Sequence, residues 1–270
     1  GGLTRLAAPA DVHALILSDV LGDDLSAIAS GPTVPDPTTY AEAVAILNSN
    51  KLWQNLPAAV QTHLQQGLLG HIPETPKADD PIFTHSGYTL IGSNTVSLHA
   101  VAKAAQNLGY ATKIYNDRLC GEAKTAAADL VLYAKHLQDQ GITEPIALVA
   151  GGETTVTVTG NGLGGRNQEL ALAFAIAAQR HGLSGAWAFL SAGTDGRDGP
   201  TDAAGAIVDP DSLQRMRNAG LNPCELLADN NAYHALSGAA DLIISGATGT
   251  NVADLQVLLL QPNNPNSIHN

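Results

Sequence analysis

The sequence predicts an α/β protein in which a Rossmann-like domain with a mostly parallel sheet is followed by a smaller, mixed α/β domain. Three observations support this fold class. The chain has 270 residues, which is long enough for two domains. Apolar runs alternate with amphipathic stretches between residues 88 and 140, as in the strand–helix units of a parallel sheet. The pattern changes after GITEP, so we place the two domains at residues 1–142 and 143–262, with a tail at 263–270.

The first domain is expected to open with an apolar strand and a long loop. The run HALILS, residues 13–18, ends at Asp19 and is typical of a buried strand in a parallel sheet. The loop of residues 19–40 is rich in Asp, Gly and Pro. Long irregular loops in compact domains are often functional. Helical periodicity, broken at Pro57, then continues to about residue 69.

Two strand–helix units complete the first domain. Either Ser93 or Asn94 is a suitable N-cap for the first of the two helices, and Gly109 is suited to the position just past its end. The predicted elements are strands at residues 89–94 and 111–117 and helices at residues 95–109 and about 121–140.

The second domain is expected to mix strand types. IALVAGG, residues 146–152, reads as a buried strand, and TTVTVTG, residues 154–160, alternates like a half-exposed antiparallel strand. An Ala/Leu-rich helix should follow at residues 166–180. The remaining predicted strands lie within residues 186–209, at 241–245 and at 254–260.

The charge balance excludes one class of partner. The chain has 25 acidic and 13 basic residues and no basic stripe, so a nucleic-acid surface is not expected. A nucleotide would need local compensation of its charge, which Mg²⁺ and one or two Arg or Lys side chains usually supply.

Cysteine content and hydropathy predict a cytoplasmic protein. Cys120 and Cys224 are far apart and have no CxxC or Cys/His spacing, which indicates neither a disulfide framework nor a zinc site. We find no apolar run of the roughly 20 residues that a membrane span requires, and no signal peptide pattern. A membrane partner is therefore not expected.

A glycine-rich loop is the most informative motif. Gly160, Gly162 and Gly165 satisfy GxGxxG between a predicted strand and a predicted helix. The Thr/Val strand before them and the lack of a suitably spaced acidic residue argue against a dinucleotide fingerprint. Arg166 opposes the helix dipole, which indicates that it faces a phosphate or a carboxylate. The alternative is a surface arginine beside a linker-like loop.

A second motif clusters three carboxylates. Asp195, Asp198 and Asp202 lie within SAGTDGRDGPTDAAGA, and like-charge repulsion disfavours such a cluster unless a cation binds or the side chains diverge. Mg²⁺ bound mainly through ATP oxygens would need only one or two of them. The alternative is a solvated Asp/Gly turn. The spacing does not match an EF-hand.

Two further positions are candidates because they follow strands. Asp19 comes just past a strand end, where open α/β sheets place their ligands, and could act as a base or as a ligand to a metal-bound water. A capping role for Asp19 fits equally well. Asn94 stands at a strand-to-helix turn, where an ordinary N-cap is the simpler interpretation.

Taken together, these motifs resemble those of the class II glycerate kinases, a family with a Rossmann-like N-terminal domain and a C-terminal MOFRL domain. The resemblance runs through ILSDVLGDDLSAIASGPTVPDPTTY, GGETTVTVTGNGLGGRNQELALAFA, SAGTDGRDGPTDAAGAIVD and SGATGTNVADLQVLLL. It implies ATP-dependent phosphorylation of D-glycerate, commonly at the 2-hydroxyl, in a cleft between the domains. Phosphorylation at the 3-hydroxyl stays open. Such proteins are often labelled hydroxypyruvate reductases, a label that the GxGxxG match could explain.

One departure from the family pattern predicts a truncated chain. Family members carry a further N-terminal portion, with a GGGSA-like segment and a functionally important Lys, upstream of the GG at which this sequence starts. We therefore expect that part of the active site is missing here. A noncatalytic ligand-binding fragment and an NAD(P)-dependent hydroxypyruvate reductase are the alternative functions.

The resemblance also implies roles for individual residues. Asp19 would orient the hydroxyl, Arg166 would meet phosphoryl or carboxylate charge, and Asp195 would hold the metal or its waters. The implied cofactors are ATP and Mg²⁺, the partners are D-glycerate and the nucleotide, and a homo-oligomer stays open. The remaining assignments are substrate binding by Ser30 and Asn94, metal binding by Asp202, and backbone access to the phosphates at Gly151, Gly152, Gly162, Gly164 and Gly165.

Overall fold

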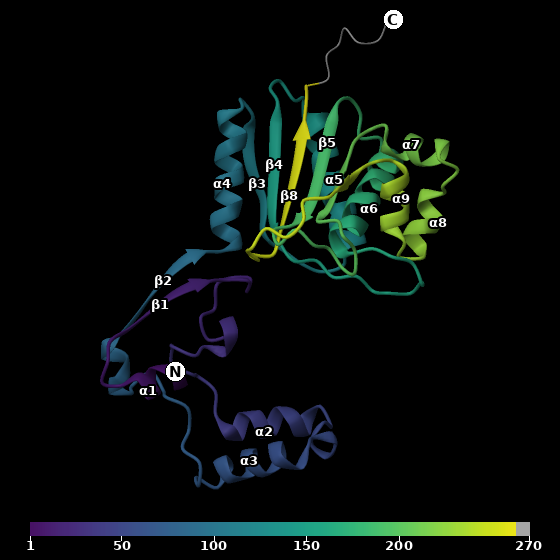
Figure 1. Cartoon of the computed structure of the whole chain (residues 1–270). Helices are drawn as coiled ribbons and strands as arrows, with labels where there is room; N and C mark the ends of the chain where they lie inside the picture. The colour runs from purple at the N-terminus through teal and green to yellow at the C-terminus, as the bar shows by residue number, and fades with distance from the viewer. Residues whose placement is uncertain (263–270) are drawn as a thin grey trace, which may run out of the picture. The chain divides into compact units, whose positions relative to one another are not determined.

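The computed structural model describes residues 1–262 and divides the chain into two compact units (Figure 1). The first unit contains Gly1–Ile16 and Asp23–Ile91. The second contains Leu17–Gly22 and Gly92–Asn270, within which the description ends at residue 262. None of the helices formed by residues 1–262 is both long and apolar enough to cross a bilayer.

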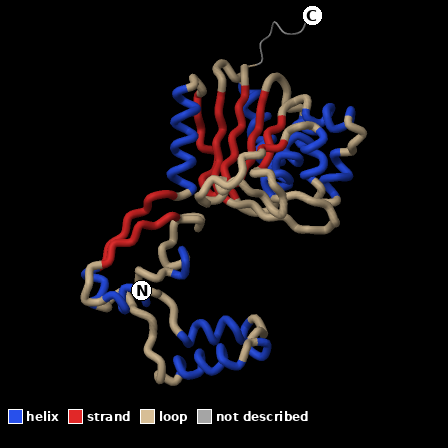
Figure 2. The backbone as a smooth tube through the Cα atoms, viewed as in Figure 1, coloured by secondary structure: helices blue, strands red, loops and turns tan. Residues whose placement is uncertain are grey.

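The first unit is built from short elements. A helical hairpin pairs α2 with α3, and a two-stranded sheet pairs β1 with β2, as Figure 2 shows. The capping box of Thr39 and Glu42 starts α2, because each side chain accepts a hydrogen bond from the other's backbone N–H. The elements are α1 (Gly2–Ala7), β1 (Val12–Leu17), η1 (Ile28–Ser30), α2 (Tyr40–Ser49), η2 (Trp53–Asn55), α3 (Ala58–Leu68), η3 (Pro81–His85) and β2 (Ser86–Gly92).

The apolar run HALILS forms strand β1, as predicted, but it is not buried in a parallel sheet. Within the described residues β1 has one neighbouring strand, β2, so alternate side chains stay open to solvent. Leu15 is 68% exposed and Leu17 is 42% exposed. Hydrophobicity predicted the strand correctly, whereas its burial depends on neighbours that a local pattern does not reveal.

The second unit is a six-stranded sheet with helices on both faces (Figure 1). The strand order is β3-β4-β8-β5-β6-β7, and β3 and β4 are parallel, whereas the other neighbours are antiparallel. Its strands are β3 (Ala111–Leu119), β4 (Ile146–Gly152), β5 (Trp187–Gly193), β6 (Gly205–Val208), β7 (Leu242–Ile243) and β8 (Asp254–Leu260). Its helices are α4 (Asn94–Asn107), α5 (Ala123–Gln140), α6 (Arg166–His181), α7 (Ser212–Asn218), α8 (Pro223–Ala228) and α9 (Ala232–Gly238).

Strand β4 is buried along its whole length because the sheet is covered on both faces. Leu148 and Ala150 belong to the large core beneath α5 and α6, whereas Val149 packs with Leu98 of α4. This two-sided burial explains why IALVAGG is a continuous apolar run without alternation. The predicted α/β class is confirmed, as are the strand and helix alternation up to residue 140 and the helix that starts at Arg166.

The six-stranded sheet spans the proposed boundary between residues 142 and 143, because β3 precedes that point and β4 follows it. The compact units change instead near residue 92. The division into domains at 1–142 and 143–262 stays a prediction.

The expected antiparallel strand TTVTVTG does not form. Among the described residues, one isolated bridge joins Thr155 to Glu122. The N–H of Thr157 donates to the carboxylate of Glu122, and the N–H of Thr159 donates to Oδ1 of Asn230. The backbone groups that a neighbouring strand would satisfy are therefore bound by side chains.

Candidate active site

Most of the predicted site residues lie at one end of the strands of the six-stranded sheet. The strands β3, β4 and β5 end there and β8 begins there, because β8 runs antiparallel to β4 and β5. Leu119, Gly152, Asp254 and Gly193 lie in one row across the four strands. Carboxyl ends of strands are where open α/β sheets place ligands.

Arg166 reaches this row from the first turn of α6. Its Nε and Nη2 donate to the two carboxylate oxygens of Asp254, at 2.6 Å and 2.9 Å. Its Nη1 lies 3.1 Å from a carboxylate oxygen of Glu153, the residue after β4. These hydrogen bonds to Asp254, opposed by burial, raise the pKa of the Arg166 guanidinium above its usual range. The sequence predicted that Arg166 faces a phosphate or a carboxylate. In the structure it faces two carboxylates of the chain itself, those of Asp254 and Glu153.

Asn94 lies behind the row and holds it in place. Its Nδ2 donates to the backbone carbonyls of Val252 and Asp254, each at 2.8 Å. Gly151 makes room for this side chain, since a Cβ at Gly151 would lie 2.1 Å from Oδ1 of Asn94. Both N–H groups of the amide are thus used within the protein, and Oδ1 is buried against Gly151 without a hydrogen-bond partner in residues 1–262. The substrate-binding role of Asn94 stays a prediction. The N-cap of α4 is Ser93, whose Oγ accepts a hydrogen bond from the N–H of Val96.

The three clustered aspartates diverge. Asp195 lies next to the row, because its Oδ1 and that of Asp254 both border the space above Gly193. Asp198 is buried and accepts hydrogen bonds from the N–H groups of Asn167 and Gln168 at the start of α6. Burial raises the pKa of Asp198, although those hydrogen bonds act in the opposite direction. The sequence predicts that either a bound cation or diverging side chains relieve the repulsion within this cluster, and in the structure the side chains diverge.

Asp202 points toward a different neighbour. Its carboxylate accepts a hydrogen bond of 2.8 Å from the hydroxyl of Tyr233 on α9. Residues 1–262 contain no group of three or more His, Cys, Asp or Glu side chains placed to share one metal ion. Mg²⁺ bound to a nucleotide needs one or two carboxylates, because phosphate oxygens and water fill its other positions. Asp195 fits this requirement, since its Oδ1 accepts from the N–H of Arg197 and its Oδ2 has no hydrogen-bond partner within residues 1–262.

Most N–H groups of the glycine-rich loop are already occupied. The N–H of Gly160 donates to the side chain of Asn230, and that of Gly162 donates to the carbonyl of Asp229. The carboxylate of Asp229 and the side chain of Asn231 accept from the two other residues between Gly160 and Gly164. A phosphate at this loop would therefore have to use Gly164, Gly165 and the start of α6.

A cavity of about 260 Å³ opens beside this end of the loop. Glu169, which is 2% exposed, forms part of its wall. Its carboxylate pairs with Lys124 at 3.3 Å and accepts a hydrogen bond of 3.0 Å from Asn230. The residues lining the cavity are Val156, Val158, Gly162, Gly164, Gly165, Arg166, Glu169, Pro200 and Asn230.

Asp19 and Ser30 belong to different units. Asp19 falls in the segment Leu17–Gly22 of the unit that contains the six-stranded sheet, and it is exposed, with no hydrogen bond or ion pair among the described residues. Ser30 lies in the first unit and has a backbone φ of 62°, a left-handed conformation that is uncommon for a residue with a side chain. The roles of both residues stay predictions.

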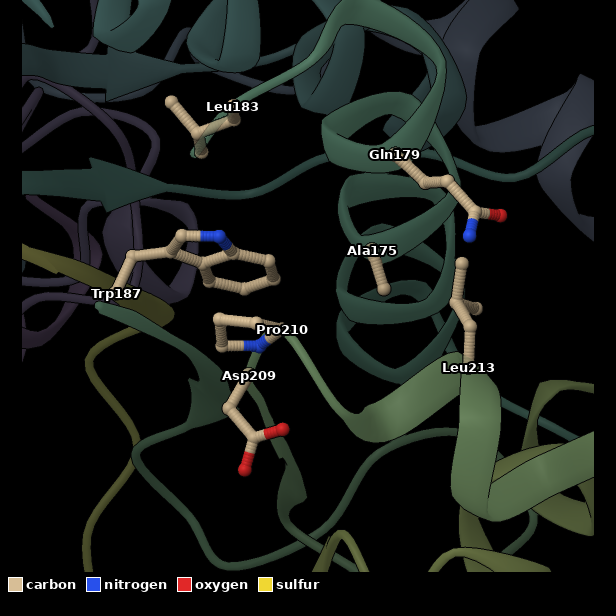
Figure 3. Close-up of a pocket in the computed structure, with 7 residues that line it drawn as sticks. All are labelled: Ala175, Gln179, Leu183, Trp187, Asp209, Pro210 and Leu213. Carbon is tan, nitrogen blue, oxygen red and sulfur yellow. The ribbon is translucent and has the colours of Figure 1, made fainter. Parts of the chain in front are cut away.

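A smaller hollow lies at the opposite end of β5 (Figure 3). Trp187 begins β5, whereas Gly193 ends it at the candidate site. The hollow measures about 130 Å³, and the ring of Pro210 lies beside the indole of Trp187 (Figure 3). The indole nitrogen is buried and has no hydrogen-bond partner within residues 1–262. This hollow is separate from the row of Arg166 and Asp254.

Sequence reasoning missed Asp254, Glu153 and Glu169. Glu153 stands directly after a predicted strand, so the rule that selected Asp19 could have selected it as well. Asp254 opens the run DLQVLLL, where a charged residue at the start of a buried strand is itself a signal. Glu169 lies inside an Ala/Leu-rich helix, and no local feature of the sequence reveals that it is buried.

Two family models match the chain. The MOFRL family matches residues 146–254, and a domain of unknown function, DUF4147, matches residues 1–65. The fold and these two matches together describe an α/β protein with a DUF4147 segment and a MOFRL segment.

The names of similar proteins indicate a more specific family within this class. A glycerate kinase from Macaca fascicularis is 36% identical over 304 residues, which cover 97% of this chain and 75% of that protein. A glycerate 2-kinase from Pyrococcus horikoshii is 42% identical over 250 residues, and an Agrobacterium vitis relative at 41% identity bears a provisional hydroxypyruvate reductase name. The chain spans only 55% and 57% of the length of these last two proteins.

A solved structure supports the same family. The crystal structure of a glycerate kinase from Thermotoga maritima matches with a TM-score of 0.83 and 39% identity, over 96% of this chain and 60% of that one. The chain belongs to the glycerate kinase family.

Proposed function

We propose that the protein is an ATP-dependent glycerate kinase that converts D-glycerate to 2-phosphoglycerate. The observation that carries this proposal is the position of Arg166, within the segment that matches the MOFRL family, at the carboxyl ends of the strands. Two of its five N–H groups donate hydrogen bonds to Asp254, and Glu153 adds an ion pair at 3.1 Å, so three N–H groups have no hydrogen-bond acceptor in residues 1–262 and stay available to an anion. A planar guanidinium of this kind is suited to bind phosphoryl or carboxylate oxygens.

The other roles follow from the chemistry of phosphoryl transfer. The hydroxyl oxygen of glycerate attacks the γ-phosphorus, the bond from that phosphorus to the β–γ bridging oxygen breaks, and ADP leaves. Asp19 orients the hydroxyl and accepts its proton, which its exposed carboxylate is free to do. Arg166 meets the negative charge of the transferring group.

The nucleotide is assigned to the glycine-lined part of the site. Gly151 and Gly152 end β4, and Gly164 and Gly165 border the cavity at the start of α6. Gly162 contributes close packing, since its N–H is already bound. Asp195 would hold Mg²⁺, and the ion when bound would neutralise phosphate charge. Asp202, the other predicted ligand, would first have to give up its hydrogen bond from Tyr233. Ser30 and Asn94 are the proposed contacts to glycerate.

Two assays with a shared substrate mixture test the proposal. The chain and the complete product of its gene are incubated separately with D-glycerate, Mg²⁺ and ATP, and ADP and phosphoglycerate are measured together. ³¹P NMR of the product distinguishes 2-phosphoglycerate from 3-phosphoglycerate. Product from the complete protein supports the kinase. Product from that protein but none from this chain would mean that residues outside the chain are required.

The hydroxypyruvate reductase is the second candidate, favoured by the name of the Agrobacterium vitis relative. It predicts oxidation of NADH with hydroxypyruvate and no need for Mg²⁺. The occupied N–H groups at Gly160 and Gly162 disfavour a dinucleotide at the GxGxxG motif. NADH oxidation without any phosphoglycerate would replace the kinase proposal.

A further inference from the structure

The two carboxylates that hold Arg166 differ in their freedom to move. The side chain of Asp254 is 0% exposed, and that of Glu153 is 44% exposed. Asp254 binds the guanidinium through two short hydrogen bonds, whereas Glu153 makes one ion pair at 3.1 Å. Exposed ion pairs contribute little to stability, roughly 0–1 kcal/mol, and they exchange readily with solvent and ions.

The backbone of Asp254 is fixed from several sides. It opens β8 between Gly152 of β4 and Gly193 of β5, and its carbonyl accepts a hydrogen bond from Asn94. The carboxylate is fully buried and accepts two hydrogen bonds from Arg166. Asp254 therefore behaves as a rigid support for Arg166.

Glu153 is pinned at its backbone and free at its side chain. Its N–H donates to the carbonyl of Leu119 at 2.8 Å, which places it at the edge of the sheet. Its carboxylate has no partner other than Arg166 within residues 1–262. A carboxylate in this position forms an ion pair with Nη1, a nitrogen of the guanidinium that a bound anion would use.

The net charge around Arg166 also distinguishes Glu153 from Asp254. One guanidinium faces two carboxylates, so the group as a whole is negative and repels a phosphate. Moving Glu153 away leaves a neutral Arg166–Asp254 pair with three N–H groups directed outward. Breaking the contact between Arg166 and Asp254 instead would leave the fully buried carboxylate of Asp254 without a partner, which costs far more free energy.

We infer that Asp254 is a positioning residue that holds the guanidinium of Arg166 in place, and that Glu153 is an exchangeable carboxylate that an incoming phosphate displaces. The catalytic part of this inference rests on the proposed kinase function. The binding part does not, because it concerns any phosphate-bearing anion.

NMR of arginine side chains tests the binding part without turnover. Protein labelled with ¹⁵N-arginine is compared with E153Q and D254N, and R166K assigns the Arg166 signal. The Nε–H of Arg166 should exchange slowly with solvent in the wild type and in E153Q, and rapidly in D254N. Inorganic tripolyphosphate is the probe anion, and E153Q should bind it several-fold more tightly than the wild type does, with Nε–H still protected.

D241N is the matched control. Asp241 is also a buried aspartate that accepts a 2.6 Å hydrogen bond from an arginine, Arg215, but it precedes β7, three strands from β8. D241N should change neither the Arg166 signal nor tripolyphosphate binding. If E153Q loses the protection of Nε–H or leaves probe affinity unchanged, or if D254N keeps the protection, the inference is wrong. E153Q alters a half-exposed side chain, so it keeps the test decisive if D254N does not fold.

Kinetics of the complete gene product test the catalytic part. D254N should lower kcat at least tenfold with a much smaller change in KM, whereas E153Q should mainly lower KM for ATP. Unchanged kcat in a folded D254N would refute the positioning role. If neither the wild type nor any variant phosphorylates glycerate but the NMR and probe results are as expected, the kinase proposal is wrong. The inference that Glu153 is an exchangeable carboxylate then still holds.

Discussion

Arg166 and Arg215 are two arginines of the same unit in nearly the same kind of surroundings. Each pairs with one buried aspartate and with one half-exposed carboxylate, Asp254 and Glu153 for Arg166, and Asp241 and Asp209 for Arg215. Their side chains are 33% and 36% exposed. Burial and ion pairing alone would therefore assign them the same role.

Hydrogen bonding separates the two. Arg215 makes five hydrogen bonds, which go to Asp209, Asp241, the hydroxyl of Ser212 and the carbonyl of Ala239. Arg166 makes two, both to Asp254. Arg166 keeps three N–H groups without a hydrogen-bond acceptor in residues 1–262 and lies beside a glycine-lined cavity. A saturated arginine stabilises a fold, whereas an unsaturated arginine at a sheet edge is available to a ligand.

The largest expected effect is on turnover. In the complete gene product, R166K should lower kcat for glycerate phosphorylation about 100-fold, because a lysine ammonium cannot reproduce the bidentate geometry of the guanidinium. R215K should leave kcat within about twofold, since it lies in a structural network. Steady-state kinetics of the two variants measure the contrast, and equal losses would remove the distinction between the arginines.

The next effect is on stability. R215M should lower the free energy of unfolding by about 3 kcal/mol, because it leaves the buried carboxylate of Asp241 without a cation. D209N removes only the half-exposed partner and should cost less than about 1 kcal/mol. Urea denaturation followed by circular dichroism gives both values. A larger loss for D209N than for R215M would contradict the assignment of Asp241 as the buried partner.

A smaller effect concerns packing at the start of α6. G165A should lower the free energy of unfolding by about 2 kcal/mol, because the added Cβ would lie 2.3 Å from Cγ of the buried Asp198. G2A is the control, since a Cβ at Gly2 meets no atom within 4 Å and the residue is helical. Thermal unfolding compares the two alanine variants. A neutral G165A would mean that Asp198 can move away without cost.

The smallest effect is a difference in pH dependence between the two regions. Burial raises the pKa of Asp198 above its ordinary 3.8, so the stability that this residue contributes is present below 3.8 and is lost as the pH rises through the folded-state pKa. Asp209 behaves in the opposite way. Despite the opposing effect of burial, hydrogen bonds from Arg215 lower the pKa of Asp209, so its contribution is present above 3.8 and is lost as the pH falls through the folded-state pKa.

Urea denaturation across the pH range tests both signs. The difference in unfolding free energy between the wild type and D198N should fall as the pH rises from about 4 toward about 7. The difference between the wild type and D209N should instead grow as the pH rises toward about 4 and then stay constant. Slopes of the same sign would contradict the two pKa shifts.

Much of the architecture was predictable from the sequence because it follows from local patterns. The strands at residues 111–119 and 146–152 and the helices that start at Asn94 and Arg166 appear where periodicity and capping place them. The Thr/Val alternation at residues 154–160 misled the prediction, because side chains of Glu122 and Asn230 bind its backbone. Those partners lie 35 and 71 residues away in the sequence, where no local pattern can identify them.

The site was predicted in part. Arg166 was selected because a cation at a helix N-terminus is unfavourable without an anion nearby, and the structure supplies two carboxylates there. Asp195 was selected because three aspartates cluster in SAGTDGRDGPTDAAGA and because that motif resembles the family's, and it lies next to the same row of strand ends. Asp254 escaped notice because it is far from Arg166 in sequence, and the antiparallel insertion of β8 between β4 and β5 brings the two together.

The sequence by itself determined the fold class, the family and the kinds of group available for chemistry, because propensity, hydrophobic period and motif order are properties of neighbouring residues. Only the tertiary structure decided which of those groups are free to act. The row of Gly152, Asp254 and Gly193 exists because β8 pairs with two strands that precede it in the chain. Whether Arg166 keeps unbound N–H groups, and whether the glycine loop does, depends on acceptors that only folding brings close.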